Sequence, residues 1–303
     1  MTPTIPKGTI YVTGNVNVDL IMGPLGIWPK VGTEIMLDHS ETRFGGAAGN
    51  TALALDALGV KHRLIASVGD DIFGRWLRSG FNAASSDWIV VPGATTISVG
   101  IVDPGGERTF ITSQGHLSVF GLADVLGHLP SRAAPGDILH LQGCFLSRPL
   151  LDSYEALLDE AVARGFSLAL DTGWPPQGWS GGLRERVIAW LARCDHLMIN
   201  DVELEAMAGE EAADPVAALR ASLRPNATLI VKGGAHGARG YRGEETAYAP
   251  APKIKALDTI GAGDVFDAGY LAAVIEGADL PAALRAGVAT ASTAISTSPR
   301  RYR

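Results

Sequence analysis

Short runs of apolar, β-branched residues alternate along most of the chain with stretches in which apolar positions recur every three or four residues. The first kind of run predicts buried strands and the second predicts amphipathic helices. We predict strands at 10–13, 64–68, 88–91, 138–141, 167–171, 197–199 and 228–231. We predict helices at 49–58, 149–164, 182–193, 215–223 and, rich in alanine, 280–298. This alternation favours an α/β fold with a mostly parallel sheet and helices on both of its faces.

Two segments interrupt this alternation. Residues 20–42 contain Pro24, Gly26, Pro29 and Gly32 and have few helical features, and residues 95–113 have the pattern of strands around a turn. Both predict β-structure outside the main sheet, although ordinary surface loops are an open alternative.

Composition narrows the classes of partner. The 303 residues are 47% apolar and 19% charged, which suits one large α/β domain. A net charge of -7 argues against a nucleic-acid partner, because phosphate backbones attract clustered Lys and Arg. The basic tail at 300–303 is expected to be solvated. Cys144 and Cys194 have no metal or disulfide spacing, and both are expected to be buried.

The remaining composition signals concern the membrane. The first eight residues lack the layout of a signal peptide, and no apolar run approaches the roughly 18 residues of a membrane span. We therefore expect a cytoplasmic protein without a membrane partner.

The most informative segment is Asp-Thr-Ile-Gly-Ala-Gly-Asp at 258–264, followed by an apolar helical pattern. Unpaired N–H groups and the helix dipole at such a helix start favour an anion, and phosphate is the commonest. The backbone of Gly261, Ala262 and Gly263 is predicted to donate to a transferring phosphoryl group. Asp264 is predicted to be the base, ionised and weak because it lies at a helix N-terminus; a helix cap is the alternative. Asp267 is expected to be solvated or capping.

Other interpretations of this segment are weaker. A glycine-rich tight turn alone is possible. The dinucleotide fingerprint needs a third glycine where the chain has Phe266, and the Walker pattern is absent from the sequence.

The heptad resembles the C-terminal signature of the ribokinase-like, or PfkB, carbohydrate kinases. Four further segments resemble that family in the same order, so that the similarity runs from about residue 9 to residue 295. They are Phe-Gly-Gly-Ala-Ala-Gly-Asn-Thr-Ala at 44–52, Gly-Asp-Asp-Ile-Phe-Gly at 69–74, Asn-Asp-Val-Glu at 200–203 and Lys-Gly-Gly-Ala-His-Gly at 232–237. The resemblance implies a ribokinase-like fold and an enzyme that uses ATP and Mg²⁺.

The resemblance also implies how the chain is divided. Residues 15–39 and 95–113 would pair into a small β lid over the sugar, and residues 1–14, 40–94 and 114–303 would form the core. Lids of this family often form a dimer interface, so a homodimer through the lid is expected. The chain ends somewhat early for the family, which suggests a reduced element beside the nucleotide.

The predicted acceptor site follows the first strand. Asn17 and Asp19 alternate onto one side of an extended segment, and amide and carboxylate groups suit vicinal diols; an Asx-turn is the alternative. The resemblance adds Gly45, Gly46 and Asn50 to this site. Arg108 on the lid is predicted either to reach the substrate or to be solvated. Ribokinase itself carries a lysine where this chain has Ala47, which leaves ribose in doubt.

The predicted nucleotide site rests on the resemblance. Asn200 would orient the phosphates and Glu203 would hold Mg²⁺ through water, with a plain helix start as the alternative. Lys232 is predicted to meet phosphate oxygens, and the glycine-rich bay after it, with Thr259, to receive the nucleotide. The residues expected closest to the nucleotide in that bay are Gly234 and Gly237, whereas His236 is expected on the surface. Asp171 starts a segment that lacks the family's usual asparagine and arginine, so its role stays open.

Together these observations predict an ATP-dependent kinase for a primary hydroxyl of a small sugar or sugar derivative. A nucleoside kinase is the first alternative and would need an aromatic pocket near the lid, for which Trp28 and Phe110 are candidates. A non-catalytic sugar or nucleotide sensor is an alternative of another class. An NAD-dependent oxidoreductase fits poorly, since the third glycine is missing.

Overall fold

The computed structural model describes residues 8–105, 108–179 and 182–303, so residues 1–7 of the predicted core lie outside the described residues. In the described part, a large sheet has the strand order β13-β12-β11-β10-β9-β8-β1-β4-β5. Its strands are β1 (Ile10–Thr13), β4 (His62–Gly69), β5 (Ser86–Val91), β8 (Ile138–Gln142), β9 (Ser167–Asp171), β10 (His196–Asn200), β11 (Thr228–Lys232), β12 (Ala238–Arg242) and β13 (Glu245–Ala249). All neighbouring pairs are parallel except those that β12 makes with β11 and β13.

The predicted mostly parallel sheet is confirmed, and each predicted strand is present with at most two extra residues at an end. The antiparallel β12–β13 hairpin and helix α2 (Ile72–Ser79) were not predicted. The helix predicted at 149–164 is divided at Ser153 into α4 (Arg148–Asp152) and α5 (Tyr154–Ala163). Ser153 adopts a non-helical backbone conformation there, which the periodicity of the apolar residues does not reveal.

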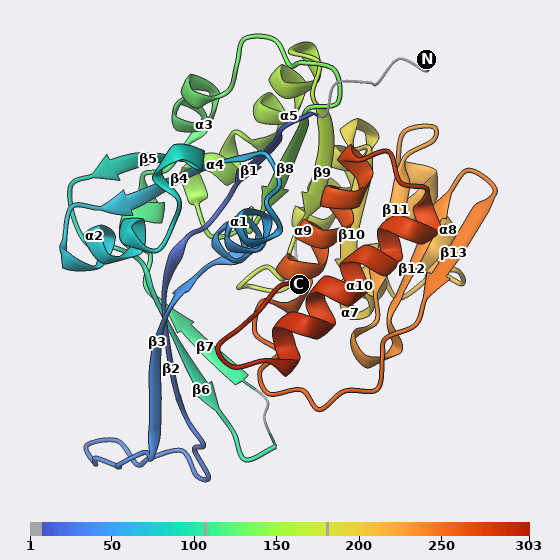
Figure 1. Cartoon of the computed structure of the whole chain (residues 1–303). Coiled ribbons are helices and arrows are strands. Elements are labelled where there is room, and N and C mark those ends of the chain that lie inside the picture. Colours follow the sequence, from blue (N-terminus) through green and yellow to red (C-terminus); the bar gives the residue numbers. More distant parts are fainter. Residues whose placement is uncertain (1–7, 106–107, 180–181) are drawn as a thin grey trace.

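Helices cover both faces of the sheet (Figure 1). One face is packed by α1 (Ala47–Leu58), α9 (Ala262–Ile275) and α10 (Leu280–Ser296), and the other by α3 (Leu122–His128), α5, α6 (Leu183–Trp190), α7 (Asp201–Ala208) and α8 (Pro215–Ser222). The strands supply alternate side chains to the two faces. In β10, for example, Met198 joins the first cluster while Leu197 and Ile199 join the second, as the period of two requires.

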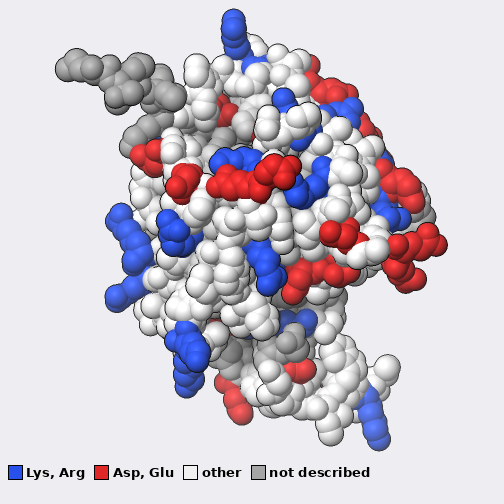
Figure 2. All heavy atoms as spheres, turned by 90° about the vertical axis from the view of Figure 1, so that its right-hand side faces the viewer, with Lys and Arg blue, Asp and Glu red and all other residues white. Residues whose placement is uncertain are grey.

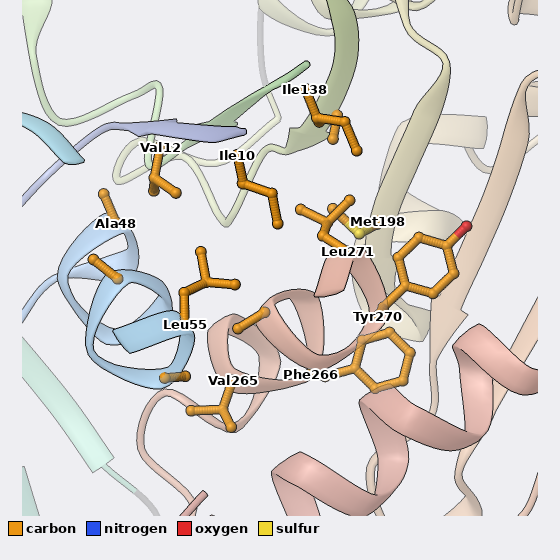
Figure 3. Close-up of a cluster of buried hydrophobic side chains, with 14 of the residues drawn as sticks. Ile10, Val12, Ala48, Leu55, Ile138, Met198, Val265, Phe266, Tyr270 and Leu271 are labelled. Carbon is orange, nitrogen blue, oxygen red and sulfur yellow. The ribbon is translucent and has the colours of Figure 1, made fainter. Parts of the chain in front are cut away.

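The first cluster fixes the helix that carries the heptad. Figure 3 shows Val265 and Leu271 of α9 on the side of Leu55 of α1 and Ile10 of β1, whereas Phe266 lies beside Tyr270 of the same helix. Leu55, Ile10, Val265 and Leu271 have no exposed surface, and burying such a side chain contributes about 1.5–3 kcal/mol. The start of α9 is therefore held against the sheet by apolar packing on several sides.

A second, smaller sheet has the order β3-β2-β6-β7, and we refer to it as the lid. Its strands are β2 (Asn17–Gly23), β3 (His39–Gly45), β6 (Ile97–Val102) and β7 (Arg108–Thr112), and they project from the core in Figure 1. The sequence division placed residues 40–45 in the core, and this boundary is wrong because they are part of β3. Most of β3 is exposed and polar, so no alternation of apolar residues marks it as a strand.

Two further features concern the surface and the membrane. On the face shown in Figure 2, acidic and basic side chains are interspersed. Among the described residues, none of the helices has both the length and the apolar character needed to cross a membrane.

Candidate active site

Polar residues end four neighbouring strands at the carboxyl edge of the large sheet. Gln142 lies opposite Asp171 on β8 and β9, and Asn200 lies opposite Lys232 on β10 and β11. Ligands gather at this edge in parallel sheets, and α9 begins beside it. The strand pattern predicted the place of Asp171, Asn200 and Lys232, whereas Gln142 was not singled out.

The Lys232 ammonium joins the sheet to α9. Its Nζ donates to Asp171 Oδ2 at 2.8 Å and to Asp267 Oδ1 at 3.2 Å. Burial raises the pKa of the Asp171 carboxyl, but the Lys232 charge and the hydrogen bonds with Asp267 and Lys232 together hold that pKa below its usual value. Burial acts against the charged form of Lys232 as well, but the charges of Asp171, Asp267 and Glu203 raise its pKa well above the usual value. Lys232 is therefore a charged group with its carboxylates already supplied by the protein.

The expectation that Asp267 is solvated or capping is wrong. Its side chain has no exposed surface, and burial raises the pKa of its carboxyl well above the usual value. All seven residues from Val265 to Leu271 are buried. This part of α9 therefore has no solvated face on which an acidic side chain could lie.

Asp264 is the third residue of α9, yet its side chain does not cap the helix. Its Oδ2 accepts a hydrogen bond from Asn50 Nδ2 at 2.8 Å, and its Oδ1 accepts from Gln142 Nε2 at 3.4 Å. Burial and the charge of Asp171 raise the pKa of Asp264 to about 7, against the lowering effects of Asn50 and Lys232. The helix N-terminus was expected to favour the ionised form of Asp264 and to make it a weak base, whereas burial shifts its pKa in the opposite direction.

The turn before α9 depends on one glycine in particular. Gly261 has φ 70, in the left-handed region, and a Cβ there would lie 2.5 Å from Asn50 Nδ2. Glycine thus allows the backbone turn and the amide that holds Asp264 to occupy the same space. The N–H of Ala262, one of the predicted phosphoryl donors, donates to the carbonyl of Thr259 at 3.2 Å.

Asn17 and Asp19 lie side by side on β2, as predicted. Asn15 Nδ2 donates to Asn17 Oδ1 at 2.9 Å, and Asn17 Nδ2 donates to Asp19 Oδ1 at 2.6 Å. A Cβ at Gly45 would lie 2.1 Å from Asp19 Oδ2, so that glycine makes room for the carboxylate. Burial raises the pKa of Asp19 to about 6, although its hydrogen bond to Asn17 opposes the shift.

Three guanidinium groups surround Asp258, the first residue of the heptad. Arg43 of β3 and Arg108 of β7 reach it from the lid, the latter at 3.3 Å, and Arg300 Nη2 donates to its Oδ2 at 2.7 Å. Arg108 also donates to Thr259 Oγ1 at 2.7 Å, so it is not solvated. The expectation of a solvated tail is wrong for Arg300. Arg43 was not predicted at all. Neither arginine belongs to one of the motifs recognised in the sequence.

Two cavities flank this turn. One, of about 480 Å³, lies at the lid, and its walls include Asp19, Asn50, Arg43, Phe44 and Tyr302. The other, of about 460 Å³, lies over α9 and α10. The predicted nucleotide residues Lys232, Gly234, Gly237 and Thr259 line the second cavity, together with Ala262, Gly263 and apolar side chains. We refer to the two as the acceptor cavity and the nucleotide cavity.

Some predicted residues do not line these cavities. Trp28 and Phe110 are exposed on the lid and are absent from the walls of the acceptor cavity, where the aromatic residues are Phe44 and Tyr302. Asn200 and Glu203 line neither cavity. They form a capping box at the start of α7, in which Asn200 Oδ1 accepts from Glu203 N at 2.8 Å and Glu203 Oε2 accepts from Asn200 N at 2.9 Å.

The described carboxylates limit how a metal ion could be held. Among the described residues no group of three or more His, Cys, Asp or Glu side chains could hold a metal. Glu203 is 5% exposed, and burial together with the charge of Asp171 raises the pKa of its carboxyl to about 7. A cation carried in with phosphate oxygens and water would need only such a single carboxylate. The residues present fit an ion of that kind and not an all-protein cage.

Replacing Lys232 by methionine should cost about 3–5 kcal/mol of unfolding free energy at about pH 8, because Asp171 and Asp267 stay buried without their cation. Without the ammonium both carboxyls have raised pKa values. Acidic groups with a raised folded pKa lower the free energy of unfolding as the pH rises through that pKa. The destabilisation of the methionine variant relative to the parent should therefore be smaller at about pH 5. Urea unfolding at both pH values measures it, with the exposed Lys61→Met as a control. An equal loss at both pH values would contradict this account.

Comparison with known proteins places these features in a family. The model of the pfkB family of carbohydrate kinases matches residues 7–300. A fructokinase of Klebsiella pneumoniae is 31% identical over 281 residues, covering 88% of this chain and 84% of the relative. A ribokinase of Haemophilus influenzae is 25% identical and covers 95% of this chain and 92% of the relative.

Solved structures agree with the fold. The ribokinase of Thermotoga maritima superimposes with a TM-score of 0.77 at 22% identity, covering 96% of this chain and 93% of that one. The nucleoside kinase of Methanocaldococcus jannaschii gives a TM-score of 0.74 at 23% identity, covering 96% of this chain and 92% of that one. The fold is thus ribokinase-like, and the chain belongs to the PfkB family of carbohydrate kinases, which are phosphotransferases with an alcohol group as acceptor.

Proposed function

We propose that this kinase transfers the terminal phosphoryl group of ATP to a primary hydroxyl of a small sugar or sugar derivative, with Asp264 as the base. The observation that carries the proposal is the position of the Asp264 carboxylate. Asn50, which lines the acceptor cavity, holds one of its oxygens, while the neighbouring Gly263 lines the nucleotide cavity. The Asp264 carboxylate itself lines neither cavity, but it lies between residues that line one and residues that line the other, a place that suits proton transfer between two bound reactants.

The reaction balances with these groups alone. The acceptor oxygen forms a bond to the terminal phosphorus as the bond from that phosphorus to the bridging oxygen breaks, and ADP leaves. Asp264 accepts the hydroxyl proton, for which a pKa near 7 is better suited than an ordinary carboxyl pKa. The start of α9 offers backbone N–H groups of Gly261 and Gly263 to the charge that builds up on the phosphoryl oxygens.

Mg²⁺ is the metal we propose for this reaction, held through water by Glu203 and by phosphate oxygens. The ion would neutralise phosphate charge during transfer. Lys232 contributes a fixed positive charge beside the phosphoryl site, since a Cβ on Gly263 would lie 3.4 Å from its Nζ. Asn200 orients the Glu203 carboxylate through the capping box.

The acceptor is proposed to be an uncharged sugar. Asp19 and Asn17 offer an acceptor and a mixed donor–acceptor for vicinal hydroxyls. Arg43 and Arg300, which line the same cavity, already have carboxylate partners within the protein, Glu41 and Asp258 for Arg43 and Asp258 for Arg300. A nucleoside is the second candidate, because the rings of Phe44 and Tyr302 line the cavity and offer apolar surface to a base.

Release of ADP from ATP and Mg²⁺ across a panel of sugars, sugar acids and nucleosides tests the function. We expect turnover with one class, and a loss of at least ~10²-fold in Asp264→Asn with the fold retained. Asp159→Asn, an exposed carboxylate on α5, is the matched control and should behave as the parent. Because the base must be ionised, parent kcat/KM should fall about tenfold per unit below pH 7, the pKa of Asp264.

Three results would contradict this assignment. Parent-like turnover in Asp264→Asn would remove the base from its role. No turnover with any compound of the panel, with ATP binding still detected by calorimetry, would favour the non-catalytic sensor. No turnover and no ATP binding would overturn the assignment of the nucleotide cavity.

Replacing Asp19 by alanine tests the acceptor cavity. The loss of a buried carboxylate that receives substrate hydroxyls should raise the acceptor KM by about 10²-fold or more. The KM for ATP should stay within about twofold of the parent value, since Asp19 does not line the nucleotide cavity. Steady-state kinetics with each substrate varied in turn measures both. An unchanged acceptor KM would place sugar recognition elsewhere.

We further propose a homodimer that forms through the lid. Exposed apolar side chains gather on the lid, in the loop between β2 and β3 and on β7, which is an edge strand. They include Ile27, Trp28, Val31, Met36, Phe110 and Ile111, with exposures of 45% to 105%. Apolar surface of this kind favours an interface with a second copy.

The proposed use of ATP is consistent with a cytoplasmic enzyme.

Sedimentation of the parent and of the double variant Trp28→Ser, Phe110→Ser checks the dimer. We expect the parent at twice the chain mass and the variant at the chain mass, with both folded, because the serines remove apolar surface that is already exposed in the lone chain. The exposed Val162→Ser on α5 serves as the control away from the lid. A parent that sediments as a single chain would contradict the proposal.

A further inference from the structure

The chain does not end at the last helix; it turns back over the acceptor cavity. After α10, the walls of that cavity include Thr297, Ser298, Pro299, Arg300 and Tyr302. Tyr302 packs against the cluster of α1, α9 and α10. The tail is therefore a wall of the cavity that Asp19 and Asn50 also line, and not a solvated extension.

Arg300 attaches this tail to the turn that precedes α9. One nitrogen of its guanidinium, Nη2, donates to Asp258 Oδ2 at 2.7 Å and to the carbonyl of Ile260 at 2.8 Å. The side chain is 20% exposed, so water competes weakly for these bonds. Hydrogen bonds between a guanidinium and a carboxylate are among the strong ones in proteins.

The turn is held at its other side by the helix from which the tail departs. The N–H groups of Leu257 and Asp258 donate to the carbonyl of Ile295 at 2.7 and 3.2 Å. Asp258 Oδ1 also accepts from Ile260 N at 3.0 Å. The segment from 257 to 260 is thus fixed by α10 on one side and by Arg300 on the other, directly before Gly261.

The Asp258 carboxylate is stabilised both from the lid and from the tail. Burial raises the pKa of its carboxyl, but the bond from Ile260 N and the charges of Arg43 and Arg300 hold it below the usual value. Arg43 and Arg108 belong to the lid, whereas Arg300 belongs to the tail. Arg300 is the member of this group that also bonds the backbone of the turn itself.

We propose that Arg300 is a positioning residue for phosphoryl transfer and that the tail residues lining the acceptor cavity, Thr297 to Arg300 and Tyr302, form a specificity-determining wall. By fixing Asp258 and the Ile260 carbonyl, the guanidinium sets the orientation of the Gly261–Gly263 backbone and, through it, of Asp264. A displacement of about 1 Å in such a site costs about 10²-fold in rate. This inference rests on the proposed kinase activity.

The test uses the full chain with the acceptor found for the parent and compares Arg300→Ala, Arg300→Lys and Arg301→Ala. Arg301 is the matched control, an exposed arginine next in the chain. We expect Arg300→Ala to lose about 10- to 100-fold in kcat and to bind ATP in calorimetry as the parent does. Arg300→Lys should retain more activity, because an ammonium has donors for both oxygens.

Two further readouts separate positioning from a merely structural role. Guanidinium chloride, far below denaturing concentrations, should restore part of the kcat of Arg300→Ala and leave Arg301→Ala unaffected. Arg300→Ala should also change the ratio of kcat/KM between acceptors of different size, since the wall loses a side chain.

The outcomes are distinct. An active parent with Arg300→Ala within twofold of Arg301→Ala would overturn the inference. A loss that neither guanidinium nor the lysine variant restores, together with a lowered thermal midpoint, would overturn it as well, in favour of a stability role. An inactive parent would overturn the proposed function, and with it the premise of this inference.

Discussion

The arrangement of this site depends on one buried ammonium between two carboxylates. Lys232 at the end of β11 contacts Asp171 at the end of β9 and Asp267 on α9, so the sheet edge and the helix are joined by charge as well as by apolar packing. Desolvation makes each of these groups costly alone, and their mutual attraction compensates only when all three are present. The same charges act on Asp264 in opposite directions, since Asp171 raises its pKa and Lys232 lowers it.

A second constraint is the close approach of backbone to polar side chains. Asp19 lies against Gly45 and Asn50 lies against Gly261, in each case where a Cβ would occupy the space of the polar group. Both glycines immediately precede the first turn of a helix or its cap, α1 for Gly45 and α9 for Gly261. Two helix starts therefore converge, and the hydrogen bond from Asn50 to Asp264 joins them. The glycines serve the packing of side chains as much as any ligand.

The sequence predicted the sheet and its carboxyl edge well, because buried parallel strands leave long apolar runs and the polar residues that follow them are conspicuous. Charges inside the protein were predicted poorly. Asp267 was expected in solvent and Arg300 in a solvated tail, since sequence spacing does not tell which charged side chain finds a partner. The predicted direction of the Asp264 pKa shift was wrong for a related reason, because the burial of this carboxyl depends on residues that are far apart in the chain. The β-structure predicted for residues 20–42 includes the start of strand β3, but its continuation to Gly45 was missed because its side chains follow no apolar pattern.

Two of the connections through which the chain passes between the sheets have a consequence for how substrates bind. The chain leaves β1 for the lid through residues 14–16 and returns from β3 to α1 at Gly46, and Gly14 and Gly46 both have positive φ. Asp19 belongs to the lid, whereas Asp264 belongs to the core. Any change in the angle between lid and core would move these two carboxylates relative to each other. With the acceptor site proposed above, lid angle and sugar affinity would then be thermodynamically linked, each changing the other by the same factor.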